Sequence, residues 1–175
     1  MKKVIIITSL ILFPFMVIMA AQKVTGAFGF KFGETFNIND ATRTSETKNG
    51  LPLYGVTPEK PVKYFKNYFL KITPKSKKIY SIWGIGHYNS NQRCVTDLEV
   101  VKALMEKKYG EFNKPDFSFH EIYSFYGDSK IISIKCQNNF SDADLYAIYT
   151  DTRLEEVAEK ERVEIEAENT DTSGL

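Results

Sequence analysis

Apolar and polar residues alternate along several stretches of the chain, and a period of two predicts β-strands. In the first stretch, 25–32, Phe28, Phe30 and Phe32 share one face of the predicted strand. Pro74-Lys75-Ser76-Lys77 provides turn chemistry between two β-rich stretches and predicts a hairpin. Together these patterns predict strands at 25–32, 51–56, 64–73, 79–88, 118–126, 130–137 and 144–150.

Two segments have apolar residues at helical spacing instead. The apolar positions of the first are Leu98, Val101, Met105 and Tyr109. Thr96 with Glu99 forms a capping-box pattern at its start, although Ser90 offers an earlier start, and Gly110 predicts its end.

The second helix is predicted to begin at Thr152, with Glu155 three residues later, and to fray beyond Glu166. The element order predicts an α+β fold, with an antiparallel sheet of about six or seven strands and two helices packed on one face. Gly84 and Gly86 share one strand face, and we expect the first helix to use that space. The polar stretch 37–50 is predicted to be a surface loop.

The N-terminus has the parts of an export signal. A basic start, Met1-Lys2-Lys3, precedes an apolar run, and small residues, Ala20 and Ala21, end it. We therefore predict a signal peptide at 1–21, a single domain at 22–168 and a flexible tail at 169–175. The expected location is periplasmic or secreted, and an uncleaved signal that anchors the domain to the inner membrane is the alternative.

Cys94 and Cys136 are the only cysteines in the sequence. Exported thiols are normally oxidised, so we predict a structural disulfide between them. Their spacing is unlike Cys-x-x-Cys, which argues against a redox-active pair, and two cysteines alone make a poor zinc site. We expect no metal and no cofactor.

Charge is unevenly distributed along the exported part of the chain. Residues 151–171 hold nine acidic and three basic side chains, whereas residues 22–150 hold 18 basic and 13 acidic ones. The overall balance of the exported chain is close to neutral, which argues against a nucleic-acid-binding protein. Mutual attraction between the basic body and the acidic final helix is the simplest interpretation of the asymmetry.

The two histidines, His87 and His120, each lie in a predicted strand beside aromatic residues. No serine-nucleophile elbow, zinc-hydrolase motif or nucleotide-binding fingerprint accompanies them. We therefore assign no catalytic residue. A small periplasmic hydrolase, the alternative, would have to use one of these histidines.

The segment 60–78 is the best candidate for a binding surface because it interleaves seven lysines with aromatic residues. If 64–73 is one strand, Tyr64, Lys66 and Tyr68 share a face, with Lys63 just before it. Such a surface suits an acidic protein or an anionic envelope component. A strand edge that lysines protect against aggregation is the alternative interpretation.

Four features of the chain are considered together. They are the exported start, the glycine–aromatic motifs Gly26-Ala27-Phe28-Gly29 and Phe32-Gly33, the helix end Lys107-Lys108-Tyr109-Gly110, and the final Asp171-Thr172-Ser173-Gly174-Leu175. In these features the chain resembles small exported bacterial proteins of unknown function. The resemblance implies export and brings no activity with it. We expect a non-catalytic binding domain, such as an inhibitor or an immunity-type protein, whose partner is a protein or an envelope component. We expect contact with a membrane only if the signal is retained.

Overall fold

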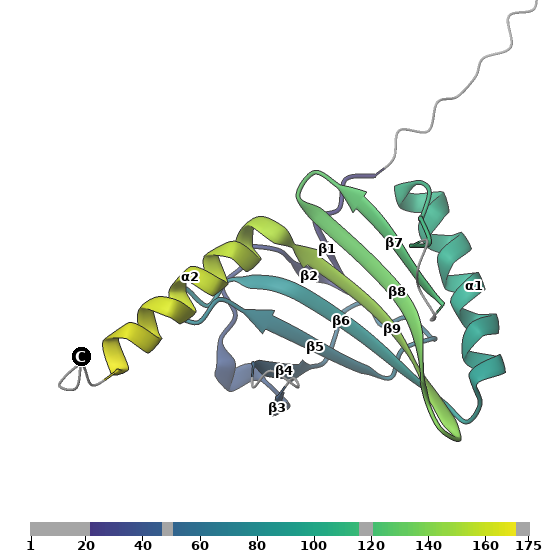
Figure 1. Ribbon diagram of the computed structural model, residues 1–175, viewed down its shortest axis with the longest axis horizontal. Helices are drawn as coiled ribbons and strands as arrows, with labels where there is room; N and C mark the ends of the chain where they lie inside the picture. The colour runs from purple at the N-terminus through teal and green to yellow at the C-terminus, as the bar shows by residue number, and fades with distance from the viewer. Residues whose placement is uncertain (1–21, 47–50, 116–120, 171–175) are drawn as a thin grey trace, which may run out of the picture.

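A computed structural model describes residues 22–46, 51–115 and 121–170 of the chain. They form a seven-stranded antiparallel sheet in the order β3-β4-β5-β6-β9-β8-β7, a separate two-stranded sheet and two helices (Figure 1). The large sheet consists of β3 (Arg43–Glu46), β4 (Pro52–Val56), β5 (Asn67–Ile72), β6 (Ile79–Tyr88), β7 (Ile122–Gly127), β8 (Lys130–Asn139) and β9 (Asp142–Asp151). The other elements are β1 (Gly26–Ala27), β2 (Phe30–Lys31), the 3₁₀ helix η1 (Ile38–Asp40), α1 (Asn91–Tyr109) and α2 (Thr152–Asn169). The α+β class and the antiparallel sheet with two helices are confirmed.

The core lies between α1 and one face of the sheet. Alternate residues of β9, including Leu145 and Ala147, are fully buried on this face, and the residues between them are half-buried on the other. α1 packs Leu98 and Val101 against β8 and β9. This is the expected result when a strand of period two meets a helix whose apolar residues form one stripe.

The disulfide between Cys94 and Cys136 is confirmed, with an S–S distance of 2.06 Å. It joins the first turn of α1 to β8, and both half-cystines are buried in the core. Ser90, the earlier of the two predicted starts, is the N-cap of α1, because its side chain accepts a hydrogen bond from the Arg93 amide. The prediction of a capping box at Thr96 is wrong. Thr96 lies inside the helix, where its hydroxyl donates a hydrogen bond to the Gln92 carbonyl oxygen.

The single strand predicted at 25–32 is instead the β1–β2 hairpin. The chain reverses at Phe28 and Gly29, which have φ values of 57° and 101°, a conformation that glycine accepts readily. This reversal places Phe28 in the core, where its ring lies edge-on to Phe65, Tyr68 and Tyr149. The aromatic residues continue to alternate with a period of two across this turn, so the sequence pattern does not reveal the turn.

The predicted loop at 37–50 contains η1 and β3, and its last residues, 47–50, lie outside the described residues. β3 pairs with β4 over four residue pairs, so the strand predicted at 51–56 has a neighbour on both sides and is not an edge strand. Polar edge strands resemble loops in sequence because neither face has to be apolar.

α2 packs against β6 and β9 and reaches the β5–β6 turn. Its first turn is capped by Asp151, which accepts hydrogen bonds from the amides of Arg153 and Leu154, so the cap lies one residue before the predicted one. Its only buried residue, Ala158, is not part of the core beneath α1. α1 thus covers the core cluster, and α2 packs against β6 and β9 at one end of the sheet.

The predicted signal peptide at 1–21, the end of the tail at 171–175 and His120 lie outside the described residues. Across the described ranges, neither helix combines the length and the apolar character that a membrane span requires.

Candidate binding site

The basic segment 60–78 is divided by the fold into two parts. The lysines near the β5–β6 turn already have partners within the chain: Lys75 pairs with Glu164 and Glu168 of α2, and Lys78 donates to the Thr35 hydroxyl. Hydrogen bonds to Glu168 and Glu164 raise the pKa of Lys75. The acidic helix thus neutralises this end of the segment, in agreement with the predicted attraction between the two parts of the chain.

The other part, Lys63 to Lys66, lies where β5 begins and β6 ends. Strand β5 starts only at Asn67, so Lys63, Tyr64 and Lys66 lie in a loop and not in a strand. Both lysines are exposed, and within the described ranges neither makes an ion pair. The Nζ atom of Lys63 lies 4.9 Å from the ring centre of Tyr64.

Two residues hold this loop against the sheet. The Tyr68 hydroxyl accepts a hydrogen bond from the Val62 amide at 2.8 Å, and it also lies 3.1 Å from the Val62 carbonyl oxygen. A Cβ atom at Gly86 would lie 2.1 Å from the Tyr64 carbonyl oxygen, so only glycine allows the loop to approach this closely. The space beside Gly84 is likewise filled by Phe28 and Phe65, and not by the predicted helix.

Tyr68 was predicted to lie on the binding surface, but its side chain is 5% exposed. The prediction is wrong because it takes Tyr64 as part of the strand and extends the alternation of faces from there to Tyr68. The strand begins only at Asn67. Tyr68 is a positioning residue: it is buried in the core, and its hydroxyl fixes the loop that carries Lys63 and Tyr64.

A cleft of about 420 Å³ opens beside the loop. We call it the basic cleft. Two stretches that are distant in sequence form its walls: the loop, and the continuous stretch from the end of β6 into the first turns of α1. Its lining residues are Lys63, Tyr64, Lys66, His87, Tyr88, Asn89, Arg93 and Asp97. Lys63, Lys66 and Arg93 supply three permanent positive charges, and Asp97 is the only carboxylate in the lining.

Asp97 is engaged on one side by Tyr88. Burial, and then a hydrogen bond to Asp97, raise the pKa of the Tyr88 hydroxyl above its ordinary value. The lone carboxylate is therefore partly satisfied within the wall. The cleft has a positive electrostatic character that favours an anionic group.

His87 lies at the rim of the cleft and faces the β8–β9 hairpin. Its Nδ1 atom is 3.0 Å from an Asp144 carboxylate oxygen, and its Nε2 atom is 3.7 Å from Asp142. The hydrogen bond to Asp144 raises the pKa of His87. Both ring nitrogens thus face carboxylates, and among the described residues no hydrogen bond joins either of them to a serine or a cysteine.

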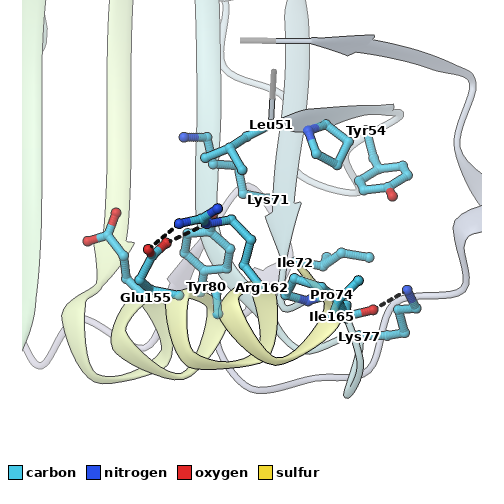
Figure 2. Close-up of a pocket in the computed structure, with 13 residues that line it drawn as sticks. Leu51, Tyr54, Lys71, Ile72, Pro74, Lys77, Tyr80, Glu155, Arg162 and Ile165 are labelled. Atoms are coloured by element: carbon cyan, nitrogen blue, oxygen red, sulfur yellow. Dashed lines mark hydrogen bonds and ion pairs between the residues drawn. The ribbon is translucent and has the colours of Figure 1, made fainter. Parts of the chain in front are cut away.

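A second cavity, of about 590 Å³, lies between α2 and the sheet. Figure 2 shows Lys71 and Tyr80 on the sheet side of this pocket and Arg162 and Ile165 on the helix side. Burial lowers the pKa of Lys71 and, together with nearby carboxylates of α2, raises that of Tyr80 to about 12. Most of the remaining lining is apolar: Leu51, Pro52, Tyr54, Ile72, Pro74 and Ala158. A pocket of this size, with an apolar lining and charged groups at its walls, suits a small ligand that is mainly apolar and carries a polar end.

The structure thus brings together three of the four predicted surface residues, Lys63, Tyr64 and Lys66, and adds His87 and Arg93, which the sequence did not associate with them. Arg93 could have been found from its position just after the Ser90 cap. His87 could not, because its place beside the loop depends on sheet pairing between distant segments.

Among the described residues, no group of three or more His, Cys, Asp or Glu side chains is arranged to hold a metal ion. Comparison with protein-family models, with curated proteins and with solved structures found no match to this chain. The resemblance to small exported bacterial proteins therefore stays a prediction.

Proposed function

We propose that this protein is an exported, disulfide-bonded binding domain that recognises an acidic protein partner through the basic cleft. In this proposal the protein acts in the periplasm or outside the cell, after removal of the signal at 1–21. The observation that carries the proposal is the convergence of Lys63, Lys66 and Arg93 from distant segments around one cleft.

The contrast within the basic segment supports a binding role. Where lysines serve the fold, as at Lys75, they pair with carboxylates of α2. Around the cleft, Lys63 and Lys66 are exposed and make no ion pair with the described residues. Like charges that are held close together repel one another, and an anionic partner relieves that repulsion.

A protein partner fits this surface better than a small anion does. The cations lie on separate walls of an open cleft of about 420 Å³, and Tyr64 and Tyr88 line it beside them. Arginine and tyrosine side chains are enriched at protein interfaces, where aromatic contact area adds to charge complementarity.

The test uses a ten-residue glutamate peptide as the probe, titrated calorimetrically into the mature, oxidised protein. We expect binding that weakens with added salt, and a loss of about tenfold or more in affinity for Lys63→Glu combined with Lys66→Glu. Lys107→Glu is the control, because Lys107 is exposed near the C-terminal end of α1, away from the cleft. Equal affinity of both variants would contradict the proposal.

The hydrolase alternative has a direct test. Because both ring nitrogens of His87 face carboxylates, we expect His87→Ala to leave the proposed biological activity of the protein largely intact. A hydrolytic activity that His87→Ala abolishes would favour the alternative.

The pocket under α2 favours a second function, the binding of a small amphiphile with an anionic head group. Lys71 is half-buried at its wall and makes no ion pair with the described residues, while its Nζ atom lies 5.2 Å from the ring centre of Trp83. Trp83 is the only tryptophan, so its fluorescence reports on this wall.

Decanoate is a suitable probe for this second function. We expect it to change the Trp83 fluorescence in a saturable manner. Ile165→Asp, which places a charge in the pocket, should abolish the change, and Val163→Asp, on an exposed face of the same helix, should not. A response that is identical in the two variants would exclude the pocket as the site.

A further inference from the structure

The tip of the β8–β9 hairpin carries a large apolar side chain in full contact with solvent. Phe140 is 107% exposed, more than any other large hydrophobic residue of the described chain. Its neighbours Asn138, Asn139 and Ser141 are polar and also exposed. Exposed apolar residues are common on protein surfaces, but an aromatic ring without support from its own chain is unusual.

The backbone at Phe140 is also unfavourable for this residue. Asn139 pairs with Asp142, so Phe140 and Ser141 form a two-residue hairpin loop. Phe140 has a φ of 64°, in the left-handed region, where a hairpin loop usually has glycine or asparagine. The tip therefore carries backbone strain and solvent-exposed apolar surface, and no contact within the described chain offsets either. Such strain is concentrated at ligand-binding and active sites.

The base of the tip is held rigidly. The Asn139 side chain donates to Asp144, and Asp144 also contacts His87 of β6 at 3.0 Å. Backbone pairing between β8 and β9 continues without interruption to the loop. A rigid aromatic side chain loses little conformational entropy on binding, which is what makes it an efficient interface anchor.

The tip lies next to the basic cleft. His87 lines the cleft and pairs with Asp144, and Phe140 lies three steps beyond that pair along the β8–β9 ladder, a distance of about 10 Å. Figure 1 shows the end of the β8–β9 hairpin beside the connection from β6 to α1, which is the wall that carries Arg93. The aromatic tip and the cations can therefore contact one partner at the same time.

We propose that Phe140 is the apolar anchor of the interface and inserts into an apolar socket, bordered by carboxylates, on a folded protein partner. This inference rests on the proposed function, since the carboxylates around the socket are those that the basic cleft recognises. A fully buried aromatic anchor surrounded by weaker polar contacts is the usual organisation of a protein–protein hot spot.

A membrane surface is a less suitable occupant. The neighbours of the ring, Asn138, Asn139 and Ser141, are polar, whereas a membrane anchor needs further apolar side chains beside it. One aromatic side chain also gives too little apolar area for stable attachment to lipid. A protein socket surrounds the ring on all sides and makes full use of it.

The first experiment places a photo-crosslinking benzophenone amino acid at position 140 of the full chain in its native host. We expect one protein to be crosslinked, and we expect the crosslink to be lost when Lys63→Glu and Lys66→Glu are added. The same amino acid at position 126 is the control, because Tyr126 is 65% exposed on β7 at the opposite end of the β8 ladder. Crosslinking to lipid alone, or equal crosslinking from both positions, would overturn the proposal.

The second experiment measures affinity for the crosslinked protein after its purification. We expect Phe140→Ala to weaken binding by about thirtyfold or more, as for a buried aromatic hot spot, and Tyr126→Ala to change it less than about twofold. Phe140→Gly should weaken binding similarly and yet raise the urea midpoint of unfolding, because glycine relieves the strained φ. This opposite response separates an anchor from a residue that serves the fold.

The outcomes distinguish the two proposals. If the lysine variants lose affinity and Phe140→Ala does not, the anchor is overturned and the proposed function stands. If neither set of variants loses affinity, the partner binds elsewhere and both proposals fail. If Phe140→Gly lowers the urea midpoint, the tip stabilises the fold and the anchor is again overturned.

Discussion

Removal of the Cys94–Cys136 disulfide should destabilise the fold strongly. The two half-cystines are 42 residues apart in the chain, and a crosslink that closes a loop of about 43 residues contributes roughly 4 kcal/mol through the entropy of the unfolded chain. The bond joins α1 to β8 and is buried, so no compensating exposure is expected. For a domain of this size, 4 kcal/mol corresponds to a fall in Tm of about 8–16 °C.

The assay is urea unfolding of the double variant Cys94→Ala and Cys136→Ala, followed by circular dichroism. We expect the free energy of unfolding to fall by about 2–5 kcal/mol, the range typical of native disulfides removed from small secreted domains. Reduction of the wild type should have the same effect, and a reductant should not affect the double variant. A loss below about 1 kcal/mol would refute the reasoning, because it would mean that the unfolded chain gains little freedom without the crosslink.

Three further predictions concern single positions. Gly86→Ala should lower the free energy of unfolding in urea by about 1–3 kcal/mol and weaken binding of the glutamate peptide. The reason is that its Cβ atom would lie 2.1 Å from the Tyr64 carbonyl oxygen in the loop. Unchanged peptide binding would contradict this prediction. Lys130→Met should lower stability by about 3 kcal/mol, because it leaves Asp151 buried without its partner at 2.7 Å; adding Asp151→Ser, which keeps a helix cap, should restore most of the loss. Asp144 raises the pKa of His87 in the folded state, so the pair should stabilise the fold fully below the unfolded pKa of about 6.5. This stabilisation should be lost as the pH rises through the pKa of His87 in the folded state. NMR titration of the imidazole in the wild type and in Asp144→Asn measures the shift, and equal pKa values in the two proteins would contradict the prediction.

The sequence predicted the local parts of the fold well. The strands β5, β6 and β8 could be predicted because each alternates with a period of two. Turn residues also separate each strand from its neighbour, as Pro74 to Lys77 do between β5 and β6. The helix stop at Gly110, with a φ of 108°, follows from a conformation that glycine adopts most easily. These features depend on residues that are close together in the chain.

The errors occurred where tertiary contacts overrode the local pattern. Phe28 continues the alternation of its segment, but its ring is needed in the core, and the chain therefore turns there. Tyr68 falls in the same register as Tyr64 only if the strand is extended by three residues. The loop that begins β5 is stabilised by the Tyr68 hydroxyl and by the missing side chain of Gly86, which no local pattern shows.

Only the part of the candidate site that lies in one segment of the chain could be predicted from the sequence, because the rest depends on tertiary contacts. Lys63 and Lys66 stand in one basic segment, so composition alone identified them. Arg93 and His87 join them only because β6 pairs with β5 and because α1 begins directly beyond β6. The exposure and strain of Phe140 likewise depend on the register of the β8–β9 hairpin, in which both strands run beyond their predicted ends and leave a loop of two residues.

The central claim is that the basic cleft is where an acidic partner binds, and NMR tests its location directly. The ten-residue glutamate peptide is titrated into the uniformly ¹⁵N-labelled mature protein, and the amide shifts are followed. The account predicts the largest shifts at residues 62–66, 87–89 and 93–97, around the basic cleft. Shifts concentrated at the β5–β6 turn, or spread evenly over the surface lysines, would contradict it.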